Sequence, residues 1–173
     1  MRLALFQPDI PQNLGAALRL TACLHVGLEI IEPCAFPLTD RAIKRAAMDY
    51  AAKAEVVRRK TWSAFMAAPE RRQGRLVLFT TKAASPFLDF AFQPGDTLLF
   101  GQESVGAPDF VHEAAQARLI IPIAPQTRSL NLATAAAIAL AEALRQTHGF
   151  PGRNDQNDLE LDQSQTVTID SNT

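Results

Sequence analysis

Three segments of the chain carry polar residues that a fold alone does not require, and each follows an apolar run. Asn13 and Arg19 lie in the first segment, Glu103 lies between two glycines in the second, and Ser129 and Asn131 lie in the third. Such side chains can orient a substrate, stabilise a developing negative charge or assist a proton transfer. Because ligands of open α/β sheets bind outside the carboxyl ends of the strands, we expect the three segments to form one crevice.

The second segment favours a ligand that lies against the main chain. Gly101 and Gly106 flank Glu103 in the stretch LLFGQESVGAP, and glycines permit both positive φ and close approach of the backbone. The spacing is not that of a dinucleotide fingerprint, and the lysine of a P-loop is missing. Neither a nicotinamide dinucleotide nor a nucleoside triphosphate is therefore favoured. The alternative interpretation is an ordinary turn with a solvated Glu103.

Simpler structural roles are open for the other polar residues. Asn13 is placed to cap a helix, and Arg19 is then an ordinary solvated side chain. Ser129 and Asn131 precede an alanine-rich helix and are candidate caps for it. Arg19 lies off the apolar stripe of its helix, so we expect it near the strand ends.

The elements that position these residues follow an alternating pattern, which is typical of a parallel sheet covered by helices on both faces. Apolar runs predict strands at 2–6, 28–31, 55–59, 76–80, 97–100 and 118–123. Helical patterns appear at about 12–26, 39–50, 62–67 and 130–149. The predicted fold class is therefore a single α/β domain.

Composition divides the chain into a basic body and an acidic tail. Residues 1–150 hold sixteen basic and thirteen acidic residues, whereas residues 151–173 hold one and five. The tail lacks apolar periodicity, so we expect a domain at 1–150 and a disordered tail at 151–173. No run is long enough for a membrane span or a signal peptide, which predicts a cytoplasmic protein. Two isolated cysteines and three scattered histidines predict reduced thiols and no metal site.

Together, the stretches NLGAALRL, LLFGQESVGAP and IPIAPQTRSLNLATAAAIALAEAL resemble the three ordered motifs of the SPOUT RNA methyltransferases. More narrowly, the chain resembles bacterial tRNA 2'-O-methyltransferases that act on the wobble nucleotide, cytidine or a modified uridine at position 34. The resemblance covers about residues 1–150. Their shared sequences EPxIPxN and RSxNL appear here as QPDIPQN and RSLNL.

The resemblance implies a parallel sheet whose C-terminal part forms a deep trefoil knot, which periodicity alone would not suggest. It also implies that backbone groups of three loops bind S-adenosylmethionine, with S-adenosylhomocysteine as product. The residues expected to bind the cofactor are Leu78, Thr80, Gly101, Glu103, Gly106, Ile121, Ile123, Ser129 and Leu130.

The resemblance also assigns roles in catalysis. Arg19 is the residue expected nearest the ribose 2'-hydroxyl, either as an unusual base or as a cation that stabilises the alkoxide. Its high pKa favours the second role. Asn13 is expected to orient Arg19 or the ribose, and Ser129 and Asn131 to position loop and substrate. Glu103 is expected to be structural, although a role near the cofactor stays open.

Partners follow from charge and from the last helix. Seven basic and two acidic residues fall within 41–60, which predicts contact with RNA phosphates. The residues expected to bind tRNA are Arg41, Lys44, Arg45, Arg58, Arg59 and Arg128. The last helix is apolar on most sides, which predicts a homodimer formed through it. Val105 stands where related sequences commonly have a basic residue. Open alternatives are another tRNA position, ribosomal RNA, or a non-catalytic RNA-binding module.

Overall fold

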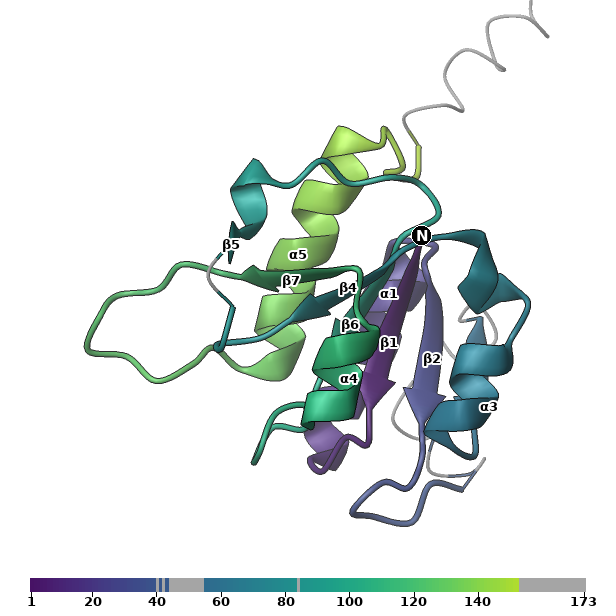
Figure 1. Cartoon of the computed structure of the whole chain (residues 1–173). Helices are drawn as coiled ribbons and strands as arrows, with labels where there is room; N and C mark the ends of the chain where they lie inside the picture. The colour runs from purple at the N-terminus through teal and green to yellow at the C-terminus, as the bar shows by residue number, and fades with distance from the viewer. Residues whose placement is uncertain (40, 42, 44–54, 84, 153–173) are drawn as a thin grey trace, which may run out of the picture.

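A computed structural model describes residues 1–39, 41, 43, 55–83 and 85–152, and within them the chain forms a seven-stranded sheet (Figure 1). The strands are β1 (Arg2–Phe6), β2 (Gly27–Ile31), β3 (Val56–Arg59), β4 (Leu76–Phe79), β5 (Ser85–Pro86), β6 (Thr97–Phe100) and β7 (Ala117–Ile120). Their order is β3-β2-β1-β6-β4-β7-β5, and neighbouring strands pair in parallel throughout. The predicted α/β class is confirmed.

Helices cover both faces of this sheet. They are α1 (Pro11–Cys23), α3 (Trp62–Ala67), α4 (Asp109–Ala114) and α5 (Leu132–Gln146), with short 3-10 turns η2 (Glu70–Gln73) and η3 (Phe87–Asp89). The predicted strands are confirmed apart from their ends. The sequence interpretation did not identify α4, although it identified α3 of the same length, and it did not identify β5, whose two residues are too few to show a periodicity. The predicted helix at 39–50 and most of the tail lie outside the described residues.

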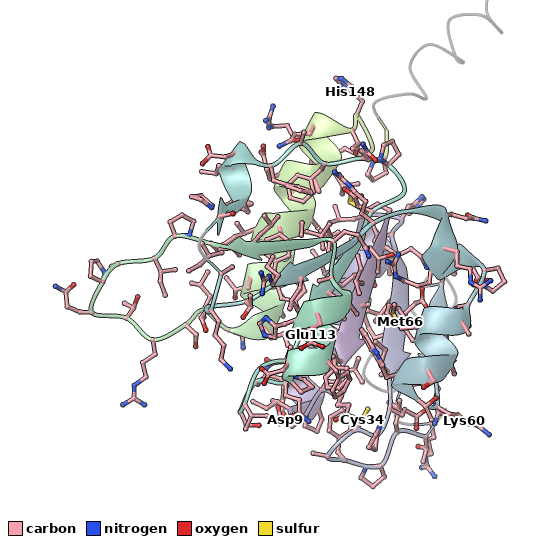
Figure 2. All side chains as sticks on the ribbon, viewed as in Figure 1. Asp9, Cys34, Lys60, Met66, Glu113 and His148 are labelled. Carbon is pink, nitrogen blue, oxygen red and sulfur yellow. The ribbon has the colours of Figure 1, made fainter. Side chains whose placement is uncertain are left out.

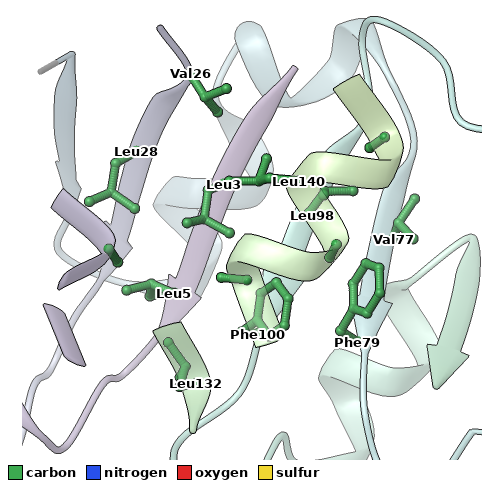
Figure 3. Close-up of a cluster of buried hydrophobic side chains, with 14 of the residues drawn as sticks. Leu3, Leu5, Val26, Leu28, Val77, Phe79, Leu98, Phe100, Leu132 and Leu140 are labelled. Carbon is green, nitrogen blue, oxygen red and sulfur yellow. The ribbon is translucent and has the colours of Figure 1, made fainter. Parts of the chain in front are cut away.

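Strand alternation separates two apolar layers. Leu3 and Leu5 of β1 join the cluster beneath α1 and α5, whereas Ala4 and Phe6 join the cluster beneath α3 and α4. Figure 3 shows the first cluster, with α5 lying across side chains of β1, β4 and β6. Both faces of the central strands are therefore buried, as parallel sheets require.

Parallel pairing brings the loops that follow the strands to one edge. Asp9 follows β1, Cys34 follows β2 and Lys60 follows β3, and Figure 2 shows all three at this carboxyl edge, with His148 at the opposite end. The neighbouring strands β1 and β6 are far apart in sequence. The chain first extends the sheet on one side of β1 with β2, and β6 later pairs with the other side of β1. This is the switch point at which α/β sheets form a binding crevice.

The last helix begins and ends where the sequence indicates. The side chain of Asn131 accepts hydrogen bonds from the N–H groups of Ala133 and Thr134, which confirms Asn131 as the cap of α5. The helix ends at Gln146, just before Gly149. The connection from β7, residues 121–131, forms a long loop that projects from the sheet (Figure 1). The trefoil knot stays a prediction of the resemblance.

Candidate active site at the carboxyl ends of the strands

A cavity of about 550 Å³ lies at the carboxyl edge, between the loops that follow β4, β6 and β7. Its volume is within the range typical of small-molecule sites. Phe79 and Phe100, the last residues of β4 and β6, line it and stack with their ring centroids 5.0 Å apart. The predicted crevice is therefore present, with an aromatic floor that the sequence interpretation missed.

Most of the residues expected to bind a cofactor line this cavity. They are Thr80, Gly101, Glu103, Gly106, Ile121, Ile123, Ser129 and Leu130. Leu78 is the exception: it does not line the cavity and its side chain is fully buried against the opposite layer of the sheet, so the expected contact through its backbone stays a prediction. Strand alternation explains the difference, because Phe79 faces the layer beneath α5 and its neighbour Leu78 must face the other one.

A chain of hydrogen bonds joins the three polar segments. The Nδ2 of Asn131 donates to Oδ1 of Asn13 at 2.7 Å, and the Nδ2 of Asn13 donates to Oε1 of Glu103 at 2.9 Å. Asn13 is buried and is not the cap of α1, because that helix begins after Ile10 without a side-chain cap. We call Asn13, Glu103 and Asn131 the amide relay. The relay joins the first turn of α1, the loop after β6 and the start of α5.

Asp9 extends the relay, and the sequence interpretation missed it. Its backbone N–H donates to Oε2 of Glu103 at 2.9 Å, and its carboxylate accepts the backbone N–H groups of Glu103 and Ser104, both at 3.2 Å. The hydroxyl of Ser104 also donates to this carboxylate. Asp9, in the loop after β1, thus both donates a hydrogen bond to the loop after β6 and accepts hydrogen bonds from it.

The two carboxyl groups have opposite pKa shifts. Burial raises the pKa of Glu103, and hydrogen bonding to Asp9 raises it further. Hydrogen bonding to Glu103 and to Ser104 lowers the pKa of Asp9. Asp9 is therefore the group of the pair that carries the negative charge more readily.

The glycines of the second loop fit a ligand held by the main chain. A Cβ on Gly101 would lie 2.5 Å from backbone atoms of Gly106 and Ala107, so this loop is closely folded on itself. Gly106 has φ of +75° and open space around its Cα. Apolar side chains of Ile121, Ile123 and other lining residues surround these backbone groups. A flat apolar ring with polar edges, such as adenine, fits this lining.

Arg19 does not line the cavity in the single chain. It is exposed, six residues after the buried Asn13, which places it about 9 Å further along α1. Ser129 is exposed and does line the cavity, while Asn131 rather than Ser129 caps α5. The structure thus brings together three of the four residues expected to act in catalysis.

The basic residues expected to bind RNA are placed unevenly. Arg128 lines the cavity and is exposed, and Arg41 is exposed. Arg58 pairs with Glu32 at 3.0 Å, and Arg59 pairs with the fully buried Glu29 at 2.6 Å. Arg59 therefore supports the sheet, because it shares with Arg2 the pairing of this buried charge. The other two, Lys44 and Arg45, lie outside the described residues.

No three His, Cys, Asp or Glu side chains within 1–39, 55–83 and 85–152, or at 41 and 43, are grouped so that they could hold a metal ion. Over the same residues, no helix has the length and apolar character needed to cross a membrane.

Similar proteins place this site in a family. Residues 1–141 match the SpoU rRNA Methylase family. A tRNA (cytidine(34)-2'-O)-methyltransferase of Beijerinckia indica is 54% identical over 83% of this chain and 90% of its own. The enzyme of that name from Escherichia coli is 36% identical over 88% of this chain and 96% of its own.

Solved structures of RNA methyltransferases are also similar to this chain. A structure from work on the 2-OH methylation of C/U34 on tRNA is 38% identical, has a TM-score of 0.77, and covers 84% of this chain and 94% of its own. The SpoU methyltransferase AviRb from Streptomyces viridochromogenes, in complex with AdoMet, is 26% identical with a TM-score of 0.75, over 84% of this chain and 60% of its own. The resemblance to SPOUT methyltransferases is confirmed, and the chain belongs to the SpoU rRNA methylase family.

Proposed function

We propose that this protein transfers a methyl group from S-adenosylmethionine to the ribose 2'-oxygen of the wobble nucleotide, cytidine or uridine, of tRNA. The observation that carries the proposal is the amide relay, which joins the first turn of α1, the loop after β6 and the start of α5 at the wall of one cavity at the carboxyl ends of the strands. Relatives that match more than four fifths of this chain are named for this activity.

S-adenosylmethionine supplies a methyl group on a positively charged sulfur, which needs no further activation. The residues of this chain that would hold it are the backbone groups of Thr80, Gly101 and Gly106 and the apolar side chains of Ile121 and Leu130, which line the cavity. In the reaction the ribose 2'-oxygen forms a bond to the methyl carbon, the carbon–sulfur bond breaks with its electrons going to sulfur, and the 2'-hydroxyl proton leaves.

The residues of this chain orient the ribose and stabilise its oxygen as the proton leaves. Asn13 and Asn131 present fixed amides at the wall of the cavity, and Ser129 offers a hydroxyl there. Arg19 supplies a positive charge to the alkoxide, since a guanidinium is a poor base at neutral pH. The proton passes to solvent or to a substrate phosphate.

Arg19 reaches the reaction through a second copy of the chain. Helices α1 and α5 pack side by side, and their outer faces carry Ala16 and Cys23 on α1 and Ala141 on α5, all of which are exposed. Burying this surface in a homodimer moves Arg19 toward the cavity of the partner. The dimer also doubles the basic surface offered to the tRNA.

The tRNA lies along the carboxyl edge. Three strand spacings separate β3 from β6, so Arg58 at the end of β3 and the cavity are about 14 Å apart along the sheet. Arg41, Arg58 and Arg128 then contact phosphates on either side of the target nucleotide. We place the protein in the cytoplasm, where tRNA is modified.

Nucleotide-resolution mapping of 2'-O-methylation tests this function. Unmodified total tRNA incubated with the enzyme and S-adenosylmethionine is expected to gain the modification at position 34. Methylation only at another tRNA position, or only on ribosomal RNA as the family's description suggests, would replace the substrate and keep the chemistry. Tight RNA binding without calorimetric binding of S-adenosylmethionine would indicate a non-catalytic module instead.

A further inference from the structure

A second cavity, of about 500 Å³, adjoins the first at the carboxyl edge. The two cavities share Lys82, Gln102, Val105 and Ala107 in their walls. The loop after β6 is thus a partition with the cofactor residues on one side and a separate cleft on the other. We call this second cavity the side cleft.

An exposed aromatic side chain forms part of the side cleft. Phe110 of α4 keeps half of its surface exposed, 50%, although its ring packs edge-to-face on Phe6 at 6.0 Å and on Trp62 at 5.9 Å. These neighbours hold the ring in place without covering it. Val105, with 69% of its surface exposed, adds a second apolar contact in the same wall. A fixed, exposed aromatic ring is the usual platform for a stacked nucleobase.

Two amide side chains supply polar contacts in the side cleft. Gln102 Nε2 donates to Gln7 Oε1 across 3.4 Å, a long hydrogen bond that a ligand can readily replace. The backbone of Gln102 is held by paired hydrogen bonds with Gly106, both 3.0 Å, and Gln7 has a positive φ of 49°. An amide can present either its oxygen or its nitrogen, so this pair can match the N4 amino group of cytosine or the O4 of uracil.

Chain connectivity places a base here. The ribose carbon that carries the reacting 2'-oxygen is bonded to the carbon that carries the base, so the target base must lie close to the cofactor cavity. The side cleft directly adjoins that cavity, and its wall carries the opposite charges of Lys82 and Asp109 beside the apolar Phe110 and Val105, so a neutral, flat base fits it better than a phosphate does. Resting on the proposed function, we infer that the side cleft binds the base of the methylated nucleotide, with Phe110 stacking on it and Gln7 and Gln102 contacting its edge.

The inference is tested by comparing the affinity of the protein for an RNA with and without the target base. The ligands are an anticodon stem-loop with its natural base at the target position and the same stem-loop with an abasic ribose there, each titrated in the presence of S-adenosylhomocysteine. The base should improve binding by the wild-type protein by about tenfold or more, as stacking on an aromatic residue commonly does. Phe110→Ala should abolish this difference and bind both stem-loops equally.

Control variants separate stacking from folding. Phe110→Tyr should keep the preference for the intact base, and Phe110→Leu should lose it while keeping apolar packing on Trp62. Leu88→Ala, which removes another exposed apolar side chain outside both cavities, should keep it. Equal binding of the two stem-loops by the wild-type protein, or an undiminished preference in Phe110→Ala and Phe110→Leu, would overturn the inference.

The proposed function can fail separately from this inference. If mapping places the methyl group on another nucleotide, the abasic substitution is made at that nucleotide and the same comparison applies. Because the readout is an affinity, the side cleft is tested even where methyl transfer to position 34 is absent.

Discussion

Asn13 and Asn131 are 118 residues apart in the chain, and their side chains are joined by a hydrogen bond of 2.7 Å. Asn131 uses its other amide atom, Oδ1, to cap α5, and Asn13 uses its Nδ2 to bind Glu103. Asn131 therefore satisfies one group of its own helix and one of another segment, whereas both partners of Asn13 lie in other segments. The placement of α5 over the sheet and the closure of the loop after β6 depend on the same two side chains.

Asn131→Asp separates these two roles. An aspartate keeps the oxygen that caps α5 but has no N–H for Asn13, so helix formation should persist while the relay is broken. We expect a decrease of about 1–3 kcal/mol in the free energy of unfolding from the unsatisfied amide oxygen, and weaker binding of S-adenosylmethionine. Urea denaturation and calorimetry measure the two effects. Unchanged cofactor affinity would show that the relay does not position the loops.

Gly101→Ala should damage the cofactor site more than Gly106→Ala. The new Cβ at position 101 would meet backbone atoms at 2.5 Å, which cannot move without opening the loop, and we expect at least about a tenfold loss of cofactor affinity. At position 106 nothing lies within 4 Å, and the cost is backbone strain of about 1–2 kcal/mol at its positive φ. Equal affinities of the two variants for S-adenosylmethionine would contradict this account of the loop.

The sequence predicts the central strands β1, β2, β4 and β6 well because each is a short, almost entirely buried apolar run between turn residues. It also predicts the cap at Asn131, since capping is decided by residues two or three positions away. It does not predict the partners of Asn13 and Asp9, which lie 90 or more residues away in Glu103, Ser104 and Asn131. Those pairs depend on the strand order, which places β1 beside β6.

The sequence does not predict where Leu78 and Arg19 lie relative to the cavity, for similar reasons. A fully apolar strand gives no alternation of polar and apolar residues, so nothing in LVLF shows that Phe79 rather than Leu78 faces the cavity. In the proposed homodimer, the position of Arg19 relative to the reaction depends on a second copy of the chain, and the sequence pattern does not give the contacts between the copies. Phe110 was missed because the sequence interpretation did not identify its helix, α4, and because the ring contacts with Phe6 and Trp62 that hold it depend on the fold.

Glu103→Gln should change how stability depends on pH. Burial raises the pKa of Glu103 above its usual 4.5, so the folded protein binds this proton more tightly than the unfolded chain does. The resulting stabilisation is complete below pH 4.5 and is lost as the pH rises through the higher folded value. Asp9 has the opposite shift, so its contribution is lost as the pH falls through its lowered value.

Glutamine cannot ionise, so Glu103→Gln should remove the loss of stability above pH 4.5. Denaturation in urea at a series of pH values gives the free energy of unfolding as a function of pH for the variant and the wild-type protein. The slopes of the two curves are compared, and a difference in stability that is the same at every pH does not count. Leu88→Ala, at an exposed side chain outside the relay, is the control and should keep the wild-type slope. The same slope in Glu103→Gln would mean that Glu103 does not titrate in this range.

Ala141→Glu should weaken the proposed dimer without unfolding the protein. Ala141 is exposed on the outer face of α5, whereas Ala136 is fully buried against the sheet of its own chain. A charge at position 141 is solvated in the monomer and buried in the dimer, so sedimentation should show monomers with an unaltered circular dichroism spectrum. Ala136→Glu should instead unfold the chain. A wild-type protein that sediments as a monomer at all concentrations would refute the dimer itself.

Mixing two inactive variants tests whether Arg19 acts on the partner's cavity. Arg19→Ala should fold, bind S-adenosylmethionine and lose methyl transfer, and Gly101→Ala should keep Arg19 but lose the cofactor. After unfolding and refolding together, a mixed dimer has one intact cavity, whose own chain lacks Arg19 and whose partner retains it. If Arg19 acts across the interface, the mixture should recover about a quarter of the wild-type activity, because half of the dimers are mixed and each has one complete site. If Arg19 acts within its own chain, no site is complete and the mixture stays inactive. Full activity of Arg19→Ala alone would remove Arg19 from the mechanism, because neither arrangement would then need its charge.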